Sequence, residues 1–228
     1  MPFDLKKTKD KWIVVGTGEG WQLCPKQSSS TIIALNDLLY KEQYGIEYDI
    51  LCIMDQLDDK PRILAGQQNL GDVIKRINDS GKPFLAPYRY EEIPKSEAFP
   101  IKDWVERFGE IYALNTISYM IMYAILKGAK EIEMVGINQA SSSEFFFEKA
   151  SVDAMLGLCI GLGIKVTVHG EKSELWSTKR RFGGNMMYGY NIPFDQYIRD
   201  EKKYGEGVVK KVLVPPKPIT RQLSRKIN

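Results

Sequence analysis

The stretch that decides the fold is residues 115–139, NTISYMIMYAILKGAKEIEMVGINQ. Its first part, residues 115–127, is apolar almost all round, which is typical of a helix buried against a sheet. Gly128 then provides a stop signal for that helix. Residues 131–135 predict a β-strand that ends in the polar turn at residues 136–139. A buried helix followed at once by a strand is the repeating unit of an α/β protein.

Helices and strands alternate on both sides of this stretch. Short apolar runs predict strands at residues 12–15, 31–35, 48–54, 82–86 and 164–168, and helical spacing predicts helices at 67–80 and 151–162. This alternation predicts an α/β, Rossmann-like fold with a mainly parallel sheet flanked by helices. Residues 87–100 (PYRYEEIPKSEAFP) are interpreted as a long surface loop, either a lid or a disordered segment.

The composition is that of a globular protein. Of the 228 residues, 43% are hydrophobic and 27% are charged, which excludes disordered, collagenous and coiled-coil chains. The net charge of +3 is too small to identify a nucleic-acid binder. The longest apolar stretch, residues 117–126, is shorter than the ~20 residues of a membrane span. The N-terminus also lacks the apolar core of a signal peptide, so we expect a cytoplasmic protein without a membrane partner.

Two domains are expected, a nucleotide-binding domain at residues 1–176 and a C-terminal basic extension at residues 177–228. The extension ends in residues 208–228, which contain six lysines and arginines and no acidic residue. Three interpretations of this tail are open. With the tyrosines that precede it, the tail contacts the phosphates and stacked bases of a nucleic acid. Alternatively, it docks on a partner protein or stays solvated.

The cysteines and the histidine limit the chemistry. Cys24, Cys52 and Cys159 are odd in number and far apart, so reduced, buried thiols are expected rather than disulfides. His169 is the one histidine, which excludes a site built from several histidines. It is either a general base or a structural residue at the end of a strand.

Candidate ligand residues are the polar residues that follow the predicted strands, because open α/β sheets bind ligands beyond the carboxyl ends of their strands. In the first such loop, glycines let backbone N–H groups approach an anion. The alternative for this loop is a tight turn that binds no anion. For the other candidates, the alternative to ligand binding is a role as a helix cap or in a turn. The candidates are Gly16, Thr17, Gly18, Glu19, Asn36, Asp37, Asp55, Asn115, Thr116, Gly136 and Asn138.

Candidate general bases are carboxylates beside an aromatic run. Glu144 and Glu148 bracket three phenylalanines, and apolar surroundings raise the pKa of a carboxyl group toward the range useful in catalysis. The alternative is that both are solvated loop acids. His169 is the third candidate.

Four segments together resemble one Rossmann-like superfamily. They are IVVGTGEGW from residue 13, TIIALND from residue 31, the stretch at 115–139, and SVDAMLGLCIGLGIKVTVHGEKSEL from residue 151. The superfamily includes the small bacterial sialyltransferases that use a CMP-activated sugar and the hydroxymethylpterin pyrophosphokinase-like proteins. The chain is still more similar to phage-encoded proteins with the same core, and the most diagnostic segment is GAKEIEMVGIN.

The resemblance assigns roles to some of the candidates. It implies that the first glycine loop lies at the nucleotide phosphate and ribose, and that Asn36 faces the cytosine. It places Asn115 and Thr116 near the phosphate or sugar, and Asn138 in the position of the family's acid after "GI". The histidine base of the sialyltransferases has no counterpart, and Glu144 and Glu148 occupy that region.

The expected function is that of a nucleotide-dependent, glycosyltransferase-like enzyme. Its co-substrate is a nucleotide or nucleotide sugar, and its acceptor is a hydroxyl group, on a DNA base or a phage component. One alternative is diphosphate transfer with Mg²⁺ held by Asp55, or by Asp58 and Asp59. The other is a non-enzymatic phage accessory or assembly protein that keeps the fold and uses the tail as its interface.

Overall fold

The computed structural model describes most of the chain up to residue 175. The described residues are 9–25, 29–35, 38–39, 45–57, 70–110, 112–139, 145–170, 173 and 175, together with the backbone of two short strands at 186–187 and 192–193. The chain divides into two units, Met1–Ser177 and Thr178–Asn228. The predicted domain boundary between residues 176 and 177 lies outside the described residues. In the second unit, β8 (Met186–Met187) and β9 (Ile192–Pro193) form an antiparallel pair.

The first unit is built on a sheet of seven parallel strands in the order β5-β4-β3-β2-β1-β6-β7. The strands are β1 (Lys11–Val15), β2 (Thr31–Leu35), β3 (Ile50–Cys52), β4 (Phe84–Ala86), β5 (Ser96–Ala98), β6 (Glu131–Val135) and β7 (Lys165–Val168). This arrangement confirms the predicted α/β, Rossmann-like fold.

The strand order reverses in the middle of the sheet. The chain starts at β1 and proceeds outward through β2 to β5, and it then returns to place β6 on the other side of β1. Val15 at the end of β1 therefore pairs with Ala34 of β2 on one side and with Val135 of β6 on the other. We call the carboxyl ends of β1 and β6, where the strand order reverses, the switch point.

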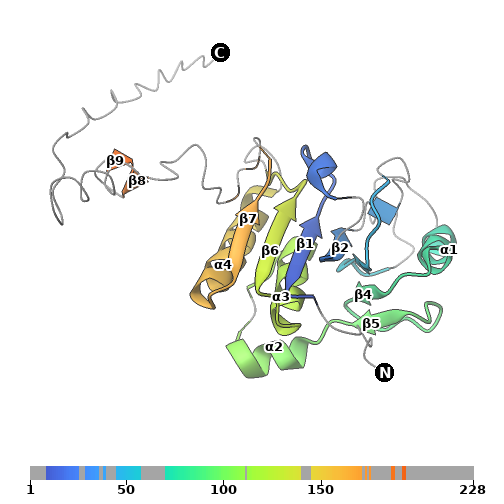
Figure 1. The fold of residues 1–228 in the computed structure, drawn as a ribbon. Coiled ribbons are helices and arrows are strands. Elements are labelled where there is room, and N and C mark those ends of the chain that lie inside the picture. Colours follow the sequence, from blue (N-terminus) through green and yellow to red (C-terminus); the bar gives the residue numbers. More distant parts are fainter. Residues whose placement is uncertain are drawn as a thin grey trace, which may run out of the picture. The chain divides into compact units, whose positions relative to one another are not determined.

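Helices cover the two faces of the sheet unequally. The helices are α1 (Leu70–Ser80), α2 (Ile101–Phe108), α3 (Thr116–Leu126) and α4 (Phe145–Gly161), with a short 3-10 helix η1 (Trp21–Leu23) after β1. Figure 1 shows α3 and α4 behind β1, β6 and β7. Alternation along β1 turns Trp12 and Val14 toward these helices, and Ile13 and Val15 toward the face on which α1 packs.

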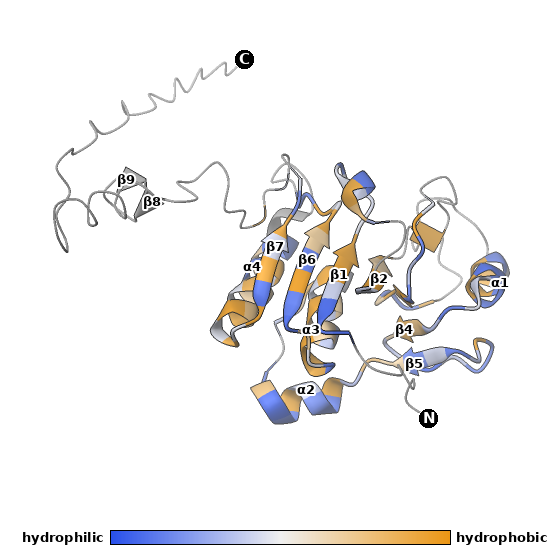
Figure 2. Cartoon of the chain, in the orientation of Figure 1, coloured by the Kyte–Doolittle hydropathy of each residue, from blue (hydrophilic) through white to orange (hydrophobic). Residues whose placement is uncertain are grey.

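Helix α3 is the most apolar helix of the core, as the sequence predicts. Nine of its eleven residues are buried, and where the helix can be seen in Figure 2 it is mostly orange, the colour of hydrophobic residues. The ring of Tyr123 meets that of Trp12 edge-on, with 6.0 Å between the centroids. Burial of this all-apolar surface explains why the stretch at residues 115–139 decides the fold.

The prediction of a long surface loop at residues 87–100 is wrong. This segment contains β5, and the side chains of Ile93, Ser96 and Phe99 are buried. The strand is missed because it is a three-residue edge strand, SEA, without an apolar run. The helix α2 after it buries Trp104. Helix α4 begins at Phe145, before the predicted start at residue 151.

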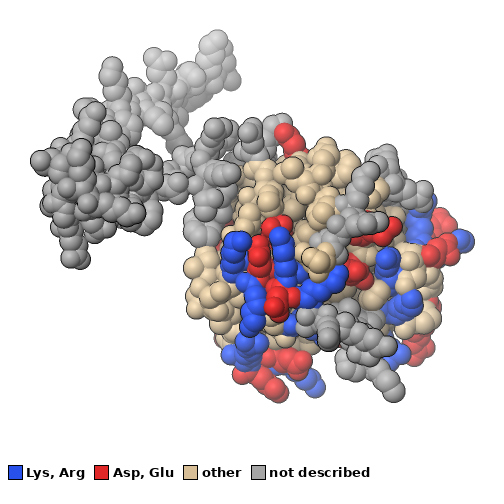
Figure 3. Space-filling view, in the orientation of Figure 1, with Lys and Arg blue, Asp and Glu red and all other residues tan. Residues whose placement is uncertain are grey.

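On the face opposite α3 and α4, the first residues of β1, β6 and β7 are charged, whereas Ile13, Val15 and Val135 further along this face are apolar and buried. Lys11 Nζ lies 2.7 Å from Glu133 Oε1 and 3.6 Å from Glu131 Oε1, and Lys165 Nζ lies 3.1 Å from Glu131 Oε1. We call these four residues the charged ladder. Figure 3 shows lysines and acidic residues gathered over these strands. This part of the sheet therefore faces solvent.

Two further expectations can be compared with the structure. Cys24, Cys52 and Cys159 are free and buried, as predicted. Within the described residues, we find no helix with the length and apolarity that a membrane crossing requires.

Candidate functional site

The loops after β1 and β6 are joined by backbone hydrogen bonds at the switch point. The amide of Gly16 donates to the carbonyl oxygen of Val135 at 2.9 Å, and the amide of Gly18 donates to that of Gly136 at 2.7 Å. Two amides of the glycine loop therefore bind the end of β6 and are not directed at a ligand. An anion at this loop would therefore have to be bound by groups other than the Gly16 and Gly18 amides.

The close approach of these two loops explains the glycines. A Cβ atom at Gly16 would lie 2.6 Å from the Gly136 carbonyl oxygen, and one at Gly18 would lie 2.8 Å from the same oxygen. Gly136 itself has a φ angle of +66°, which a side chain would strain. Close packing of the two loops therefore explains these glycines without a bound phosphate.

Polar side chains surround this junction. Thr17 and Asn138 are half-buried and Glu19 is exposed. Asn138 Nδ2 lies 3.0 Å from the position that a Cβ at Gly18 would occupy, and a Cβ at Gly170 would lie 3.5 Å from the Glu19 carbonyl oxygen. The loops after β1, β6 and β7 therefore meet at one point, and the polar side chains of Thr17, Glu19 and Asn138 belong to these loops.

A second polar cluster joins the N-termini of α3 and α4. Asn115 caps α3, because its Oδ1 accepts hydrogen bonds of 2.9 Å from both the amide and the hydroxyl of Ser118. Its Nδ2 donates to Glu148 Oε2 at 3.2 Å. Buried Ser118 and Ser151 are joined through their hydroxyls at 2.8 Å. Because α4 starts after β6, this cluster lies at the carboxyl edge of the sheet.

The cluster confirms the predicted cap at Asn115 and gives Glu148 a defined orientation. Thr116, the first residue of α3, is buried beside the cap. Two helix N-termini at one edge produce a positive electrostatic potential there. The arrangement can hold an anionic group near an oriented carboxylate.

His169 lies on the other side of the sheet from Glu148. Its Nε2 is 3.5 Å from Glu133 Oε2 of the charged ladder, whereas Glu148 belongs to α4, which lies behind the sheet in Figure 1. The cause is strand alternation, which places residues 131, 133 and 169 on the face away from α3 and α4. His169 and Glu148 are therefore not brought together as a catalytic pair.

Other predicted residues lie apart or outside the described chain. Asp55 is exposed after β3, which is separated from β1 by β2. Asn36, Asp37, Asp58, Asp59 and Glu144 lie outside the described residues. Where side chains are described, no group of three histidine, cysteine, aspartate or glutamate residues is arranged to hold a metal ion.

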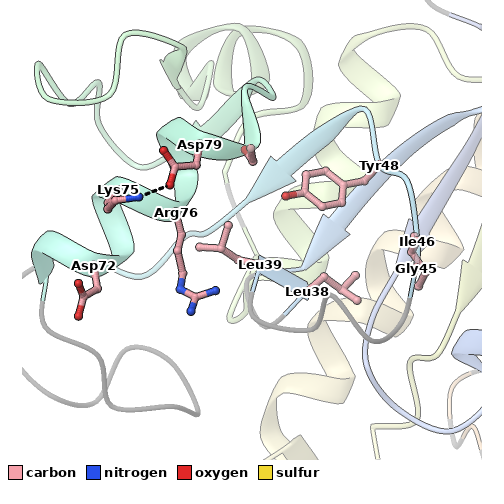
Figure 4. A pocket seen from close by; sticks show the side chains of 10 residues that line it. Leu38, Leu39, Gly45, Ile46, Tyr48, Asp72, Lys75, Arg76 and Asp79 are labelled. Atoms are coloured by element: carbon pink, nitrogen blue, oxygen red, sulfur yellow. Dashed lines mark hydrogen bonds and ion pairs between the residues drawn. The ribbon is translucent and has the colours of Figure 1, made fainter.

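A cavity of about 770 Å³ lies on the α1 side of the sheet (Figure 4). Its apolar wall includes Leu38 and Leu39, and its rim includes the ion pair between Lys75 and Asp79. Burial raises the pKa of Tyr48, which also lines it. None of the predicted site residues that the structure describes lines this cavity, so it is separate from the switch point.

Two features of the site are not anticipated by the sequence. The Ser118–Ser151 contact joins residues that are 33 positions apart, and no local pattern marks it. Gln139 falls within a predicted ligand loop but carries no signal of its own, although it has a positive φ angle and a buried side chain.

No protein-family model matches the chain, and no curated protein matches it. Among solved structures, it is similar to the sialyltransferase CstII from Campylobacter jejuni in complex with the substrate analogue CMP-3FNeuAc, with 14% identity and a TM-score of 0.46 over 69% of this chain and 79% of that chain. It is also similar to the sialyltransferase CST-II in complex with a trisaccharide acceptor and CMP, with 14% identity and a TM-score of 0.48 over 91% and 96% of the two chains. At these identities the likeness is one of fold.

Proposed function

We propose that the chain is a nucleotide-dependent transferase of the glycosyltransferase type, with a nucleotide-sugar donor bound at the carboxyl edge of β1 and β6. The observation that carries the proposal is the junction of the loops after these two strands at the switch point. Open α/β sheets bind ligands beyond the carboxyl ends of their strands, at the point where the strand order reverses. Thr17, Glu19 and Asn138 are the polar side chains at that position.

The N-termini of α3 and α4 support the proposal. The leaving group of a nucleotide sugar is a phosphate, and the partial positive charge of a helix N-terminus stabilises developing negative charge. Asn115 and Thr116 start α3, and Glu148 lies in the first turn of α4. This edge therefore has the electrostatic character that phosphate departure requires.

Glu148 is the residue that we assign as general base. Its carboxylate is oriented by the Asn115 side-chain amide at 3.2 Å, and an oriented carboxylate can take the proton of an acceptor hydroxyl. His169 is unsuited to the same reaction, because it faces Glu133 on the opposite side of the sheet. In this proposal the sugar lies between the glycine loop and the start of α4.

The acceptor follows from the sequence resemblance to phage-encoded proteins. We propose a hydroxyl group on a DNA base or on a phage component, brought to the site by the basic residues at 208–228, in the host cytoplasm. This part of the proposal depends on the tail, whose six cations suit a polyanion.

The test is a thermal-shift screen of CMP, UDP, GDP and ADP and their sugar derivatives. A nucleotide at 100 times its Kd is expected to add about 2.7 kcal/mol to the free energy of unfolding. Thr17→Val and Asn138→Ala should weaken binding of the active nucleotide about tenfold, because each removes a polar contact. Thr167→Val is the matched control, because Thr167 lies within β7, away from the switch point.

Catalysis is tested separately from binding. Glu148→Gln keeps a group that can accept from Asn115 and removes the proton acceptor, so turnover should fall at least 100-fold with an unchanged Kd for the donor. A flat thermal response to the whole screen would remove the enzyme proposal. Strict dependence of turnover on Mg²⁺ would favour diphosphate transfer instead.

A further inference from the structure

The turn after β6 contains a residue in an unfavourable conformation. Gln139 has a φ angle of 48°, and no other non-glycine residue in the described part of the chain has a positive φ. The left-handed region is unfavourable for a side chain of this length, and such residues concentrate at ligand sites. The conformation therefore needs an explanation.

The side chain of Gln139 also has a buried polar atom without a hydrogen-bond partner, as Trp12, Trp104 and Tyr123 do in the described part of the chain. The residue is 5% exposed, and its Oε1 atom is buried with no hydrogen-bond partner in the described structure. Buried polar atoms nearly always have a partner, and an unpaired acceptor destabilises the folded state. Two separate unfavourable features thus coincide at one position.

Neighbouring contacts hold the turn in this conformation. The Gly18 amide donates to the Gly136 carbonyl oxygen at 2.7 Å, and the Ser173 hydroxyl donates to that of Ile137 at 2.8 Å. The backbone leading to Gln139 is therefore fixed from both sides. A strained residue that its surroundings hold in place is typical of a preorganised binding site.

We propose that Gln139 is a ligand-positioning residue, whose Oε1 accepts a hydrogen bond from an N–H or O–H group of the bound nucleotide. The inference rests on the proposed function, which places the nucleotide at this switch point. A buried acceptor discriminates between ligands, because a ligand without the matching donor leaves the acceptor unpaired. Gln139 would thus select the nucleotide that the transferase uses.

The first variant is Gln139→Met, which keeps the length of the side chain and removes the acceptor. We expect the Kd for CMP to rise about tenfold. We also expect the melting temperature of the protein without nucleotide to be equal to or above that of the wild type, because a buried unpaired oxygen is gone. A purely structural residue would give the reverse pattern, a lower melting temperature with unchanged affinity.

A second variant and a control protect the test against misfolding. Gln139→Asn tolerates the left-handed region and keeps the amide, but it draws the oxygen back by one methylene group. It should fold and show the same loss of CMP affinity. Gln56→Met is the matched control, because Gln56 is an exposed glutamine after β3. The Gln56→Met variant should bind CMP with unchanged affinity.

Analogues of the probe show which group Gln139 contacts. UMP lacks the base amine of CMP, and 2′-deoxy-CMP lacks one ribose hydroxyl. The analogue without the contacted donor should bind the wild type more weakly and be insensitive to Gln139→Met. If all three nucleotides lose affinity equally in the variant, the contacted donor is one that they share, the ribose 3′-hydroxyl.

The contrary outcomes are distinct. If Gln139→Met and Gln139→Asn bind CMP as tightly as the wild type does, the assignment of Gln139 is wrong and the proposed function stands. If the wild type binds none of the nucleotides of the screen, this inference fails together with the proposed function.

Discussion

The side-chain amide of Asn115 donates a hydrogen bond of 3.2 Å to Glu148 Oε2 and thereby joins the start of α3 to the first turn of α4. The same asparagine caps α3 through its other side-chain atom. One residue therefore stabilises a helix end and orients the proposed base. A change at Asn115 is expected to affect stability and turnover through different atoms.

Asn115→Ala should lower the free energy of unfolding by about 1–2 kcal/mol, because it removes the cap of α3. Asn115→Ser keeps a capping oxygen and should recover most of this loss. Both variants lack the bond to Glu148, so both should reduce turnover. Urea denaturation and a donor turnover assay separate the two effects. Equal stability of the alanine and serine variants would contradict the capping role.

Gly16→Ala should destabilise the fold, because the added Cβ would lie 2.6 Å from the backbone oxygen of Gly136. Overpacking of this kind lowers the free energy of unfolding by about 1–3 kcal/mol. Gly157→Ala is the control, because Gly157 lies in α4 with no atom within 4 Å of its added Cβ. It should stabilise the protein by about 0.5–1 kcal/mol. Chemical denaturation of both variants measures the difference, and equal effects would refute the packing role.

Glu131→Gln tests the charged ladder as a function of pH. The hydrogen bond from Lys165, together with the charge of Lys11, lowers the pKa of Glu131 below its ordinary value. A carboxyl group with a lowered pKa in the folded state contributes stability above the ordinary carboxyl pKa, and the contribution is lost as the pH falls through the folded-state pKa.

The wild type should therefore be more stable than Glu131→Gln at pH 7, by less than about 1 kcal/mol because the pair is partly exposed. The two proteins should converge in acid and in high salt. Glu106→Gln, at an exposed position of α2, serves as the control. A difference that persists unchanged at low pH would show that ionisation of Glu131 is not its source.

The three thiols should resist alkylation in the folded protein. Burial raises the pKa of Cys24 to about 11 and that of Cys159 to about 12, and it raises the pKa of Cys52 as well. Because the thiolate is the reactive form, iodoacetamide at pH 8 should leave the native mass unchanged. The same treatment in 8 M urea should add three carbamidomethyl groups. Alkylation without denaturant would contradict the burial of the modified cysteine.

The local sequence was sufficient to predict the buried elements. Apolar runs at β1, β2 and β6 and the mostly apolar sequence of α3 are sufficient to predict these elements, because most of their residues are buried. The sequence does not reveal β5, whose three residues SEA pair with β4 and are further held by hydrogen bonds between Ser96 and Tyr90. Helix α2, which follows a proline-rich segment, is also not predicted from the sequence.

The candidate site divides in the same way. Polar residues after strands and the cap at Asn115 follow from the order of residue types along the chain, because parallel strands end at a common edge. The separation of His169 from Glu148 does not follow from the order of residue types. It depends on the face of the sheet toward which each side chain points after the helices have packed.

The α/β class of this chain and the position of its polar loops at one edge of the sheet follow from the order of its residues, because burial of apolar surface acts through local periodicity. Three features exist only in the folded chain: the glycine amides bind β6, Glu148 pairs with Asn115, and Gln139 is buried in a left-handed turn. These features arise from contacts between segments far apart in the chain, whose free energies exist only after the sheet and its helices have come together.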